Sequence, residues 1–205
     1  MGLTAEQLNA DLDALAGVDA DIARELARVG YPEPRIRDRG ADTLLRTIVG
    51  QQVSVAAAAS MWRRLTERFG TRVDLAALAA ADDELLRSCG MSRQKSRYLR
   101  SLAALVTAGE LAFDALPEDD EAAIAQLVRI DGVGRWSAEI YLLFAEGRGD
   151  IWPAGDLAVQ EAVKRIKRLD ARPNERETRA IAEAWRPWRG AATIFAWHAY
   201  ANPAL

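Results

Sequence analysis

A turn with two glycines is the part of this sequence best suited to hold an anion. Gly132 and Gly134 flank Val133, and apolar residues recur at three- and four-residue spacing on both sides of this turn. That period indicates two amphipathic helices. Because glycine tolerates positive φ and lets another backbone come close, such a turn leaves backbone N–H groups at the positive end of the second helix. The turn is therefore a candidate phosphate site, and an ordinary helix–helix turn with a glycine C-cap is the alternative.

Asp156 is the candidate catalytic carboxylate. It lies in a turn-rich segment directly before a helical stripe formed by Val159, Val163 and Ile166. At that position it can cap the helix by accepting hydrogen bonds from the first-turn amides. A carboxylate fixed in a poorly hydrated site can also stabilise a positive charge that develops during a reaction, or it can activate water. The sequence leaves both roles open.

Several ordered motifs resemble one known family. They read IVGQQVS (48–54), GMSRQK (90–95), IDGVGRWSA (130–138), WPAGDLAV (152–159) and WRPWR (185–189). In this order and at this spacing they resemble the helix-hairpin-helix (HhH-GPD) DNA glycosylases, and among these the bacterial DNA-3-methyladenine glycosylases of type II. The likeness covers most of the chain from about Thr43 onward.

The resemblance implies a monofunctional DNA glycosylase of base excision repair. Such an enzyme flips alkylated bases, 3-methyladenine and related alkylpurines, out of double-stranded DNA and excises them, with Asp156 as its catalytic residue. Relatives that also cut the strand use a hairpin lysine to form a Schiff base, and here Trp136 occupies the matching position, so we expect no lyase activity. The alternatives are a glycosylase for another damaged or mismatched base and a non-catalytic DNA-binding module. A binding module alone has no need of Asp156.

The same resemblance assigns the residues that would contact DNA. Gln52 would fill the gap left in the duplex, with hydrogen bonding between helices as the alternative for Gln51 and Gln52. Alkylated purines are cationic, so aromatic faces would bind them by stacking and cation–π attraction. The base pocket would contain Trp136 and Trp197, with core packing as the alternative and Trp152 as a weaker candidate. Residues of the hairpin would hold the DNA backbone: Gly132, Val133, Gly134 and Arg135.

No cofactor is required by this interpretation. Family members often hold a monovalent cation with hairpin carbonyl groups, which here belong to Val128, Ile130 and Val133. The resemblance therefore implies a structural Na⁺ or K⁺ that bridges protein and phosphate. Asp131 stands where many relatives have proline, which leaves the hairpin less rigid.

Composition bounds the class of protein. The chain has 205 residues, 50% hydrophobic residues and a net charge of −3, whereas nucleic-acid binders typically carry a basic excess. Local basic faces can still attract phosphate, and two are candidates, with a solvated helix face as the alternative for each. Cys89 is the only cysteine and His198 the only histidine, so an intramolecular disulfide or a four-cysteine iron–sulfur cluster is excluded, and both residues are expected to be structural. The two basic groups are 93–100 (Arg93, Lys95, Arg97, Arg100) and 164–168 (Lys164, Arg165, Lys167, Arg168).

The sequence predicts a protein that acts in the cytoplasm. No apolar run approaches the roughly 18 residues of a membrane span, and the first twenty residues are acidic where a secretory signal would be basic and then apolar. We expect a monomer that is associated with the nucleoid and has no membrane partner.

The expected fold is all-α, with roughly ten helices. No stretch alternates polar and apolar residues over enough positions to form the strands of a sheet. Thr4, Asp19, Ser92 and Asn174 are predicted N-caps, and Gly50 to Gln52 interrupts a helical stripe that resumes at Val55. Pro187 is predicted to open the last helix. By resemblance, residues 41–144 form a six-helix domain that ends in the helix-hairpin-helix, and residues 1–40 with 145–205 form a second helical subdomain that carries Asp156. A cleft between them would hold DNA.

Overall fold

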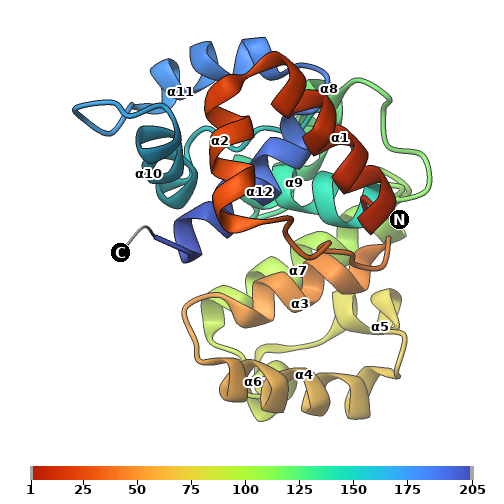
Figure 1. Ribbon diagram of the computed structural model, residues 1–205. Helices are drawn as coiled ribbons and strands as arrows, with labels where there is room; N and C mark the ends of the chain where they lie inside the picture. Colours follow the sequence, from red (N-terminus) through yellow and green to blue (C-terminus); the bar gives the residue numbers. More distant parts are fainter. Residues whose placement is uncertain (1, 204–205) are drawn as a thin grey trace. The chain divides into compact units, whose positions relative to one another are not determined.

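The computed structural model describes residues 2–203, which form twelve α-helices, one π-helical turn and one 3₁₀ turn (Figure 1). No strand occurs in that range. The all-α fold class expected from the sequence is confirmed. Within the same range, no helix combines the length and the apolar character that crossing a membrane requires.

Contacts within the chain divide it into two compact units. One contains residues 1–37 and 142–205, and the other contains residues 38–141. The boundaries predicted from the sequence, 41 and 144, lie a few residues further along the chain. The structure groups Leu142, Leu143 and Phe144 with the first unit. The helix that follows the hairpin changes from α to π geometry at the same point.

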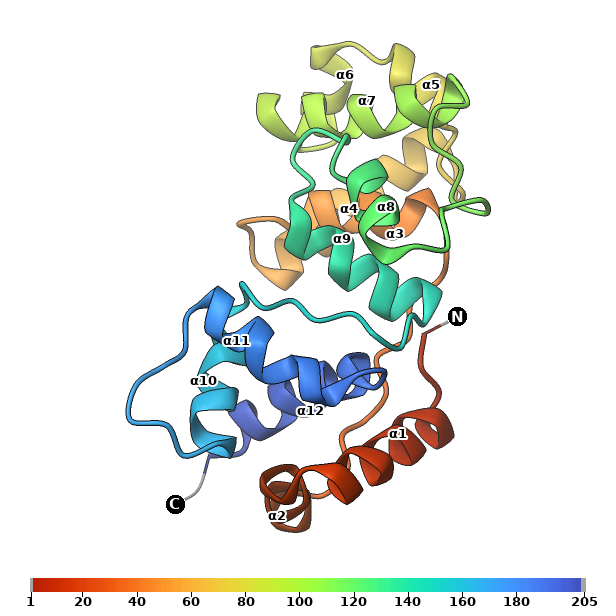
Figure 2. The same ribbon diagram turned by 90° about the horizontal axis from the view of Figure 1, so that it is seen from above.

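The first unit joins segments from both ends of the chain. Its central helix is α12, which contacts α1, α2 and α10, and Figure 2 shows α10, α11 and α12 gathered together. The predicted stripe of Val159, Val163 and Ile166 is buried on α10. The elements of this unit are α1 (Ala5–Val18), α2 (Ala20–Val29), η1 (Leu142–Glu146), α10 (Leu157–Ile166), α11 (Glu175–Ala182), η2 (Glu183–Trp185) and α12 (Arg189–Ala201).

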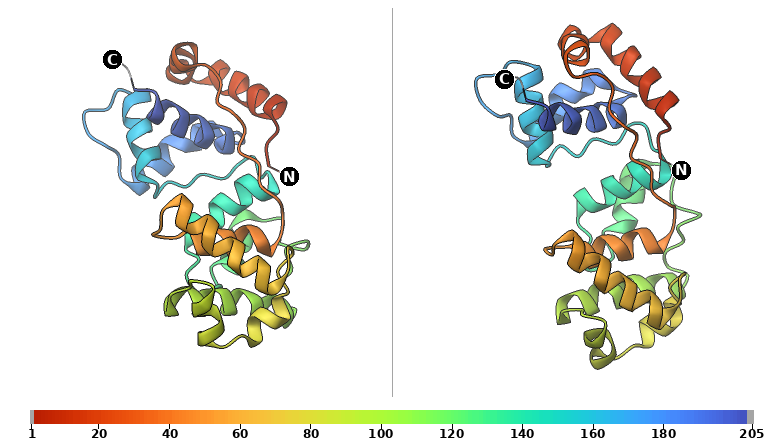
Figure 3. Two further views of the ribbon diagram at one scale, coloured as in Figure 1. Left: turned by 90° about the horizontal axis from the view of Figure 1, so that it is seen from below. Right: turned by 60° about the horizontal axis from the view of Figure 1, so that its bottom comes forward.

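The second unit is built around α3, drawn in orange, which contacts α4, α7 and α9 (Figures 1 and 3). Leu44, Leu45 and Ile48 of α3 are buried, as are Leu65 of α4 and Leu99 of α7. The elements of this unit are α3 (Ala41–Gly50), α4 (Val55–Phe69), α5 (Leu75–Ala80), α6 (Asp83–Ser88), α7 (Arg93–Thr107), α8 (Asp120–Leu127) and α9 (Arg135–Tyr141).

Short polar side chains set the starts of helices, as predicted. Thr4, Asp19 and Ser92 accept hydrogen bonds from first-turn amides of α1, α2 and α7. Asn174 forms a full capping box with Glu177 at the start of α11. The predicted interruption is also present, since α3 ends at Gly50 and α4 begins at Val55.

Three details of the predicted helices are wrong. The helix α5 was not expected, because its six residues, LAALAA, are too short and too uniform to show a period; the second unit therefore has seven α-helices in its described residues instead of six. Pro187 does not open the last helix, since it lies in the turn after η2 and α12 begins at Arg189. The sequence spacing places Tyr98, Leu102, Leu105 and Val106 on the inward face of α7. In the structure this face is rotated, with Tyr98 half-buried and Lys95 buried.

Asp19 links distant segments of the first unit. Its carboxylate caps α2 and accepts hydrogen bonds from Trp185 Nε1 (2.7 Å) and Lys167 Nζ (3.1 Å). Lys167 also pairs with Asp21 at 2.8 Å. Burial raises the pKa of Asp19, but the hydrogen bonds from Trp185 and Lys167 outweigh it and the net pKa is lowered. Hydrogen bonds from Lys167 and Arg24 lower the pKa of Asp21 to about 2.

We expect Asp21→Asn to lower the free energy of unfolding at neutral pH and to make the protein less sensitive to acid. The pKa of Asp21 is about 2 in the folded state against an ordinary value of 3.8, so its contribution is present above that ordinary value and is lost as the pH falls toward 2. Urea denaturation at pH 7 and at about pH 3 measures both effects, with Asp170→Asn at an exposed position as the control. Equal loss of stability in acid for wild type and Asp21→Asn would contradict this prediction.

Candidate active site

The glycine turn between α8 and α9 has the predicted helix-hairpin-helix form. The Val133 N–H donates to the Ile130 carbonyl at 3.0 Å, and both side chains are buried beneath the turn. The Gly134 carbonyl accepts the first hydrogen bond of α9, from the Ala138 N–H at 3.1 Å. The amides that precede Ala138 in this helix have no carbonyl one turn back within it. These amides form the positive end of α9.

The two glycines of the turn serve different purposes. Gly132 has φ +78°, and a Cβ atom there would lie 2.1 Å from the ring of Tyr98. Gly132 is therefore required by the packing of the hairpin on α7. A Cβ atom on Gly134 would meet nothing within 4 Å. The absence of a side chain at Gly134 thus leaves open surface beside the α9 amides, which is where an anion can approach.

The hairpin is also anchored to α7 through Asp131. Its N–H donates to Ser101 Oγ at 3.0 Å, and its carboxylate pairs with Arg97 at 3.2 Å. Asp131 replaces the rigidity expected of proline with two contacts to a neighbouring helix. For the expected Na⁺ or K⁺ site, the Ile130 carbonyl already accepts one hydrogen bond but keeps a second lone pair. No cluster of three His, Cys, Asp or Glu side chains suited to a metal occurs among the described residues.

The loop between α3 and α4 is tied to the hairpin. Gln51 Nε2 donates to the Gly132 carbonyl at 3.0 Å, so the interhelical hydrogen bond considered for the two glutamines is made by Gln51. Gln52 is exposed and has φ +55°, a conformation that non-glycine residues rarely adopt. The Val49 carbonyl accepts a hydrogen bond from the buried ammonium of Lys95 at 2.7 Å, and burial lowers the pKa of this lysine. The loop therefore holds Gln52 outward in a strained conformation.

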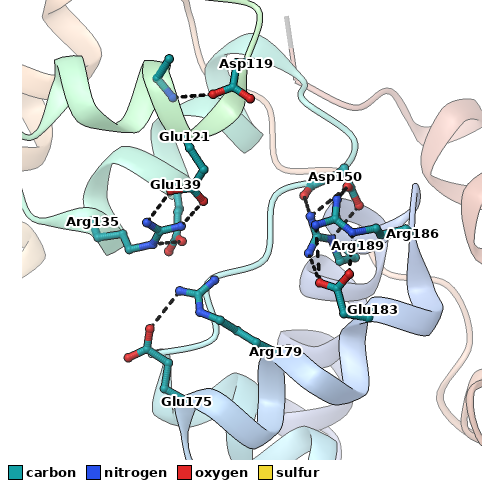
Figure 4. A network of polar contacts seen from close by, with 11 residues as sticks. Asp119, Glu121, Arg135, Glu139, Asp150, Glu175, Arg179, Glu183, Arg186 and Arg189 are labelled. Atoms are coloured by element: carbon teal, nitrogen blue, oxygen red, sulfur yellow. Dashed lines mark hydrogen bonds and ion pairs between the residues drawn. The ribbon is translucent and has the colours of Figure 1, made fainter.

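Arg135, a predicted DNA contact, is engaged by two carboxylates. Its guanidinium donates to Glu121 (2.8 Å) and Glu139 (2.9 Å), as Figure 4 shows. The hydrogen bond with Glu121 contributes most to raising the pKa of Arg135. The sequence shows a basic residue beside the turn, but it does not show that the carboxylates of Glu121 and Glu139 compensate its charge. Trp136, the next residue, is 48% exposed, so the core-packing alternative is excluded for it.

Asp156 caps α10 and also faces an aromatic side chain. One oxygen, Oδ1, accepts the N–H groups of Ala158 (2.8 Å) and Val159 (3.1 Å). The other, Oδ2, accepts Trp197 Nε1 at 3.3 Å. The carboxylate is half-buried, and the indole contact is not part of helix capping. The two roles left open by the sequence are thus compatible, because they use different oxygens.

Trp197 lies among groups that suit a flat cation. Its half-buried ring contacts Phe144, with centroids 5.7 Å apart and planes at 60°, and the Arg35 guanidinium carbon is 5.3 Å from its centroid. This ring therefore already holds a planar cation by cation–π attraction. Trp152, the weaker candidate, is 3% exposed and packs edge-on against Trp185 at 5.3 Å, so it belongs to the core. The contacts of Phe144 and Arg35 with Trp197 could not be predicted from the sequence, because neither residue shares a helical face with Trp197.

The remaining candidates have structural surroundings. Cys89 is buried, as expected, and His198 Nε2 is 3.0 Å from the Val29 carbonyl. Neither basic group forms a single free face: Lys95 is buried, Arg97 and Arg100 pair with carboxylates, and Lys167 pairs with Asp19 and Asp21.

The chain is similar in fold and in sequence to known DNA glycosylases. The fold matches that of the Schizosaccharomyces pombe 3-methyladenine DNA glycosylase in complex with abasic DNA, with a TM-score of 0.76, 27% identity, and coverage of 92% of this chain and 95% of that chain. The chain is 32% identical over 187 residues to DNA-3-methyladenine glycosylase 2 of Escherichia coli, and 27% identical over 162 residues to the Bacillus subtilis protein YfjP. These alignments cover 84% and 75% of this chain. The chain spans 64% of the Escherichia coli relative and 56% of YfjP.

The fold and the hairpin define a helix-hairpin-helix protein. Residues 45–187 match the family model of the HhH-GPD superfamily of base excision DNA repair proteins. The chain belongs to this superfamily, and the resemblance seen in the sequence motifs is confirmed.

Proposed function

We propose that this protein is a DNA glycosylase that hydrolyses the bond between deoxyribose and an alkylated purine in double-stranded DNA. The observation that carries this proposal is the carboxylate of Asp156, which is held by two amides and the indole of Trp197. The named relatives support it: two are 3-methyladenine DNA glycosylases, and one of them was solved with abasic DNA, the product of base excision.

Asp156 would act on the charge that develops during bond cleavage. When the C1′–N bond breaks, its electron pair leaves with the base and positive charge spreads over C1′ and the ring oxygen of the sugar. A fixed carboxylate stabilises that charge without having to reorganise. Water then adds to C1′ and loses a proton, which leaves an abasic site. A purine alkylated on a ring nitrogen leaves as a neutral molecule, so the reaction needs no strong acid.

Trp197 would recognise the base. Its ring already attracts the Arg35 guanidinium at 5.3 Å, and a cationic alkylpurine has the same flat shape and sign of charge. Trp136 is exposed beside the hairpin and would add a second aromatic contact with the DNA. Preference for alkylated over normal purines follows from the charge of the base.

The hairpin would hold the DNA backbone. The amides around Gly134 lie at the positive end of α9 with open surface beside them, as a phosphate contact requires. The contact would be made by the backbone of Gly132, Val133, Gly134 and Arg135, because the Arg135 side chain is occupied by Glu121 and Glu139. Gln52, exposed at a strained position, would enter the gap left by the flipped base.

We propose no catalytic cofactor. A Na⁺ or K⁺ held by the carbonyls of Val128, Ile130 and Val133 would stiffen the hairpin and neutralise phosphate charge, since carbonyl oxygens suit hard cations.

We further propose a cytoplasmic monomer. A glycosylase for another damaged or mismatched base is the second candidate, and a panel of duplexes that each carry one different damaged base, assayed for base release, separates the two.

The central test is Asp156→Asn. The amide keeps the size and capping capacity of the side chain but loses its charge, so we expect single-turnover release of an alkylpurine to fall by about 10²–10³, on the order of 3–4 kcal/mol, or by more, while lesion binding persists. Asp74→Asn is a matched control, because Asp74 caps α5 in an exposed position. Excision by Asp156→Asn at a near wild-type rate would show that Asp156 is only a helix cap.

A second test separates the two glycines of the hairpin. Gly134→Val should fold, since a Cβ there meets no atom, yet should weaken binding to any duplex by about tenfold or more, the worth of one charge-assisted hydrogen bond at roughly 1.5 kcal/mol. Gly132→Ala should instead lower thermal stability, because it clashes with Tyr98. Fluorescence anisotropy and circular dichroism measure the two effects. Unchanged affinity of folded Gly134→Val would remove the phosphate site from the hairpin.

A third test concerns the reaction type. Because Trp136 stands where a Schiff-base lysine would be needed, the enzyme should leave an intact abasic site. Borohydride added during turnover should trap no covalent protein–DNA adduct, and strand cleavage should appear only after alkali treatment. An adduct that depends on a lysine of the protein would refute monofunctional chemistry.

A further inference from the structure

The loop that leads to Asp156 is fastened to the first turn of α12. Arg189 Nε and Nη2 donate to the two carboxylate oxygens of Asp150 at 2.7 and 2.8 Å, and Nη2 also donates to the Asp150 carbonyl at 3.0 Å. Beside this clamp, the Gly190 N–H donates to the Gly149 carbonyl at 2.6 Å. Figure 4 shows the carboxylate of Asp150 facing the guanidinium groups of Arg186 and Arg189. The loop and the helix are therefore joined by both side chains and backbone.

The close approach of α12 to the loop depends on the type of residue at the contact. A Cβ atom on Gly190 would lie 2.7 Å from the Gly149 carbonyl oxygen, so the helix can come this near only with glycine there. One turn along α12, Thr193 Oγ1 donates to the Ile151 carbonyl at 3.1 Å. Arg189 is largely buried, with an 11% exposed side chain, which protects its bidentate ion pair from solvent.

The far end of the same loop is fastened to the same helix. Trp197 lies eight residues after Arg189, about 12 Å along α12 at 1.5 Å per residue, and its indole donates to Asp156 Oδ2 at 3.3 Å. Between the two ends, Gln160 Nε2 of α10 donates to the Ala154 carbonyl at 2.8 Å. A single rigid helix thus sets the position of both Asp150 and Asp156.

We propose that Arg189 is a positioning residue for excision, acting through Asp150 to set where α12 holds the Asp156 loop and hence the geometry of the Trp197–Asp156 pair. This inference rests on the proposed function, because it takes Asp156 as the catalytic carboxylate. Loss of the bidentate clamp lets the loop shift relative to Trp197, and misplacement of a catalytic group by about 1 Å can cost on the order of 10²-fold in rate. Binding of DNA by the hairpin does not depend on this clamp.

Arg186 offers a matched control. It also pairs with Asp150 and with Glu183 (2.9 Å), but its side chain is 50% exposed and it donates to no backbone carbonyl of the loop among the contacts described. An exposed ion pair of this kind contributes little. Arg189→Lys keeps the charge and loses the bidentate fork, and Arg186→Lys makes the same change outside the clamp.

The first measurement is single-turnover excision from a duplex that carries one 7-methylguanine. Arg189→Lys and Asp150→Asn should each excise about 10- to 100-fold more slowly, with the dissociation constant for the same duplex essentially unchanged. The double variant should be no slower than the slower single variant, because both changes break one contact. Arg186→Lys should excise at nearly the wild-type rate. Thermal denaturation of each variant sets a common temperature at which all are folded, and Asp150→Asn carries the test should Arg189→Lys fail to fold.

The second measurement needs no activity. The indole N–H resonance of Trp197, assigned with Trp197→Phe, should shift in Arg189→Lys and Asp150→Asn but not in Arg186→Lys. Folded Arg189→Lys and Asp150→Asn proteins with wild-type excision and an unmoved indole resonance would overturn the proposal, and so would strictly additive rate losses in the double variant. If the wild-type protein releases no base, the proposed function fails, whereas the indole shift still decides whether Arg189 positions the Trp197–Asp156 pair.

Discussion

The hydrogen bonds accepted by Asp156 join three parts of the first unit at one side chain. Oδ1 caps α10, where the loop ends, by accepting hydrogen bonds from two first-turn amides. Oδ2 accepts a hydrogen bond from the indole of Trp197 on α12. Helix capping usually has only a structural role. Here it also orients the carboxylate, whose second oxygen faces an aromatic ring. A fixed orientation is what electrostatic stabilisation of a developing cation requires, because a rigid dipole or charge costs no reorganisation during reaction. Folding and the proposed chemistry thus both require a fixed orientation of this carboxylate.

The surroundings of Asp156 depend on contacts between the ends of the chain. Asp19, near the N-terminus, accepts a hydrogen bond from Trp185 and forms an ion pair with Lys167. Trp185 in turn packs against Trp152 of the loop that leads to Asp156. The first helices are therefore part of the frame that supports the loop, although they carry no candidate site residue. The N-terminal helices α1 and α2 thus complete the core on which α12 rests.

Local features of this protein could be predicted from the sequence, and long-range partners could not. The N-caps, the interrupted helix at Gly50 and the hairpin follow from short-range chemistry, since the side chain and the amides it binds are within a few residues. The Arg189–Asp150 and Arg135–Glu121 pairs join residues far apart in the sequence, and many other pairings of opposite charges were equally open. Tryptophans show the same limit. Trp136 and Trp152 both lie in recognisable motifs, yet one is 48% exposed and the other 3%, because packing against other segments decides burial.

The buried ammonium of Lys95 also changes the electrostatic character of the Gln52 loop. The last carbonyls of α3 point toward this loop and form the negative end of the helix dipole, which by itself repels a phosphate chain. Lys95 places a positive charge 2.7 Å from the Val49 carbonyl, where that negative end is strongest. The loop therefore presents a largely neutralised helix terminus to its surroundings. Under the proposed function, a chain with a net charge of −3 can in this way bring Gln52 to the DNA without a basic residue at the surface of the loop.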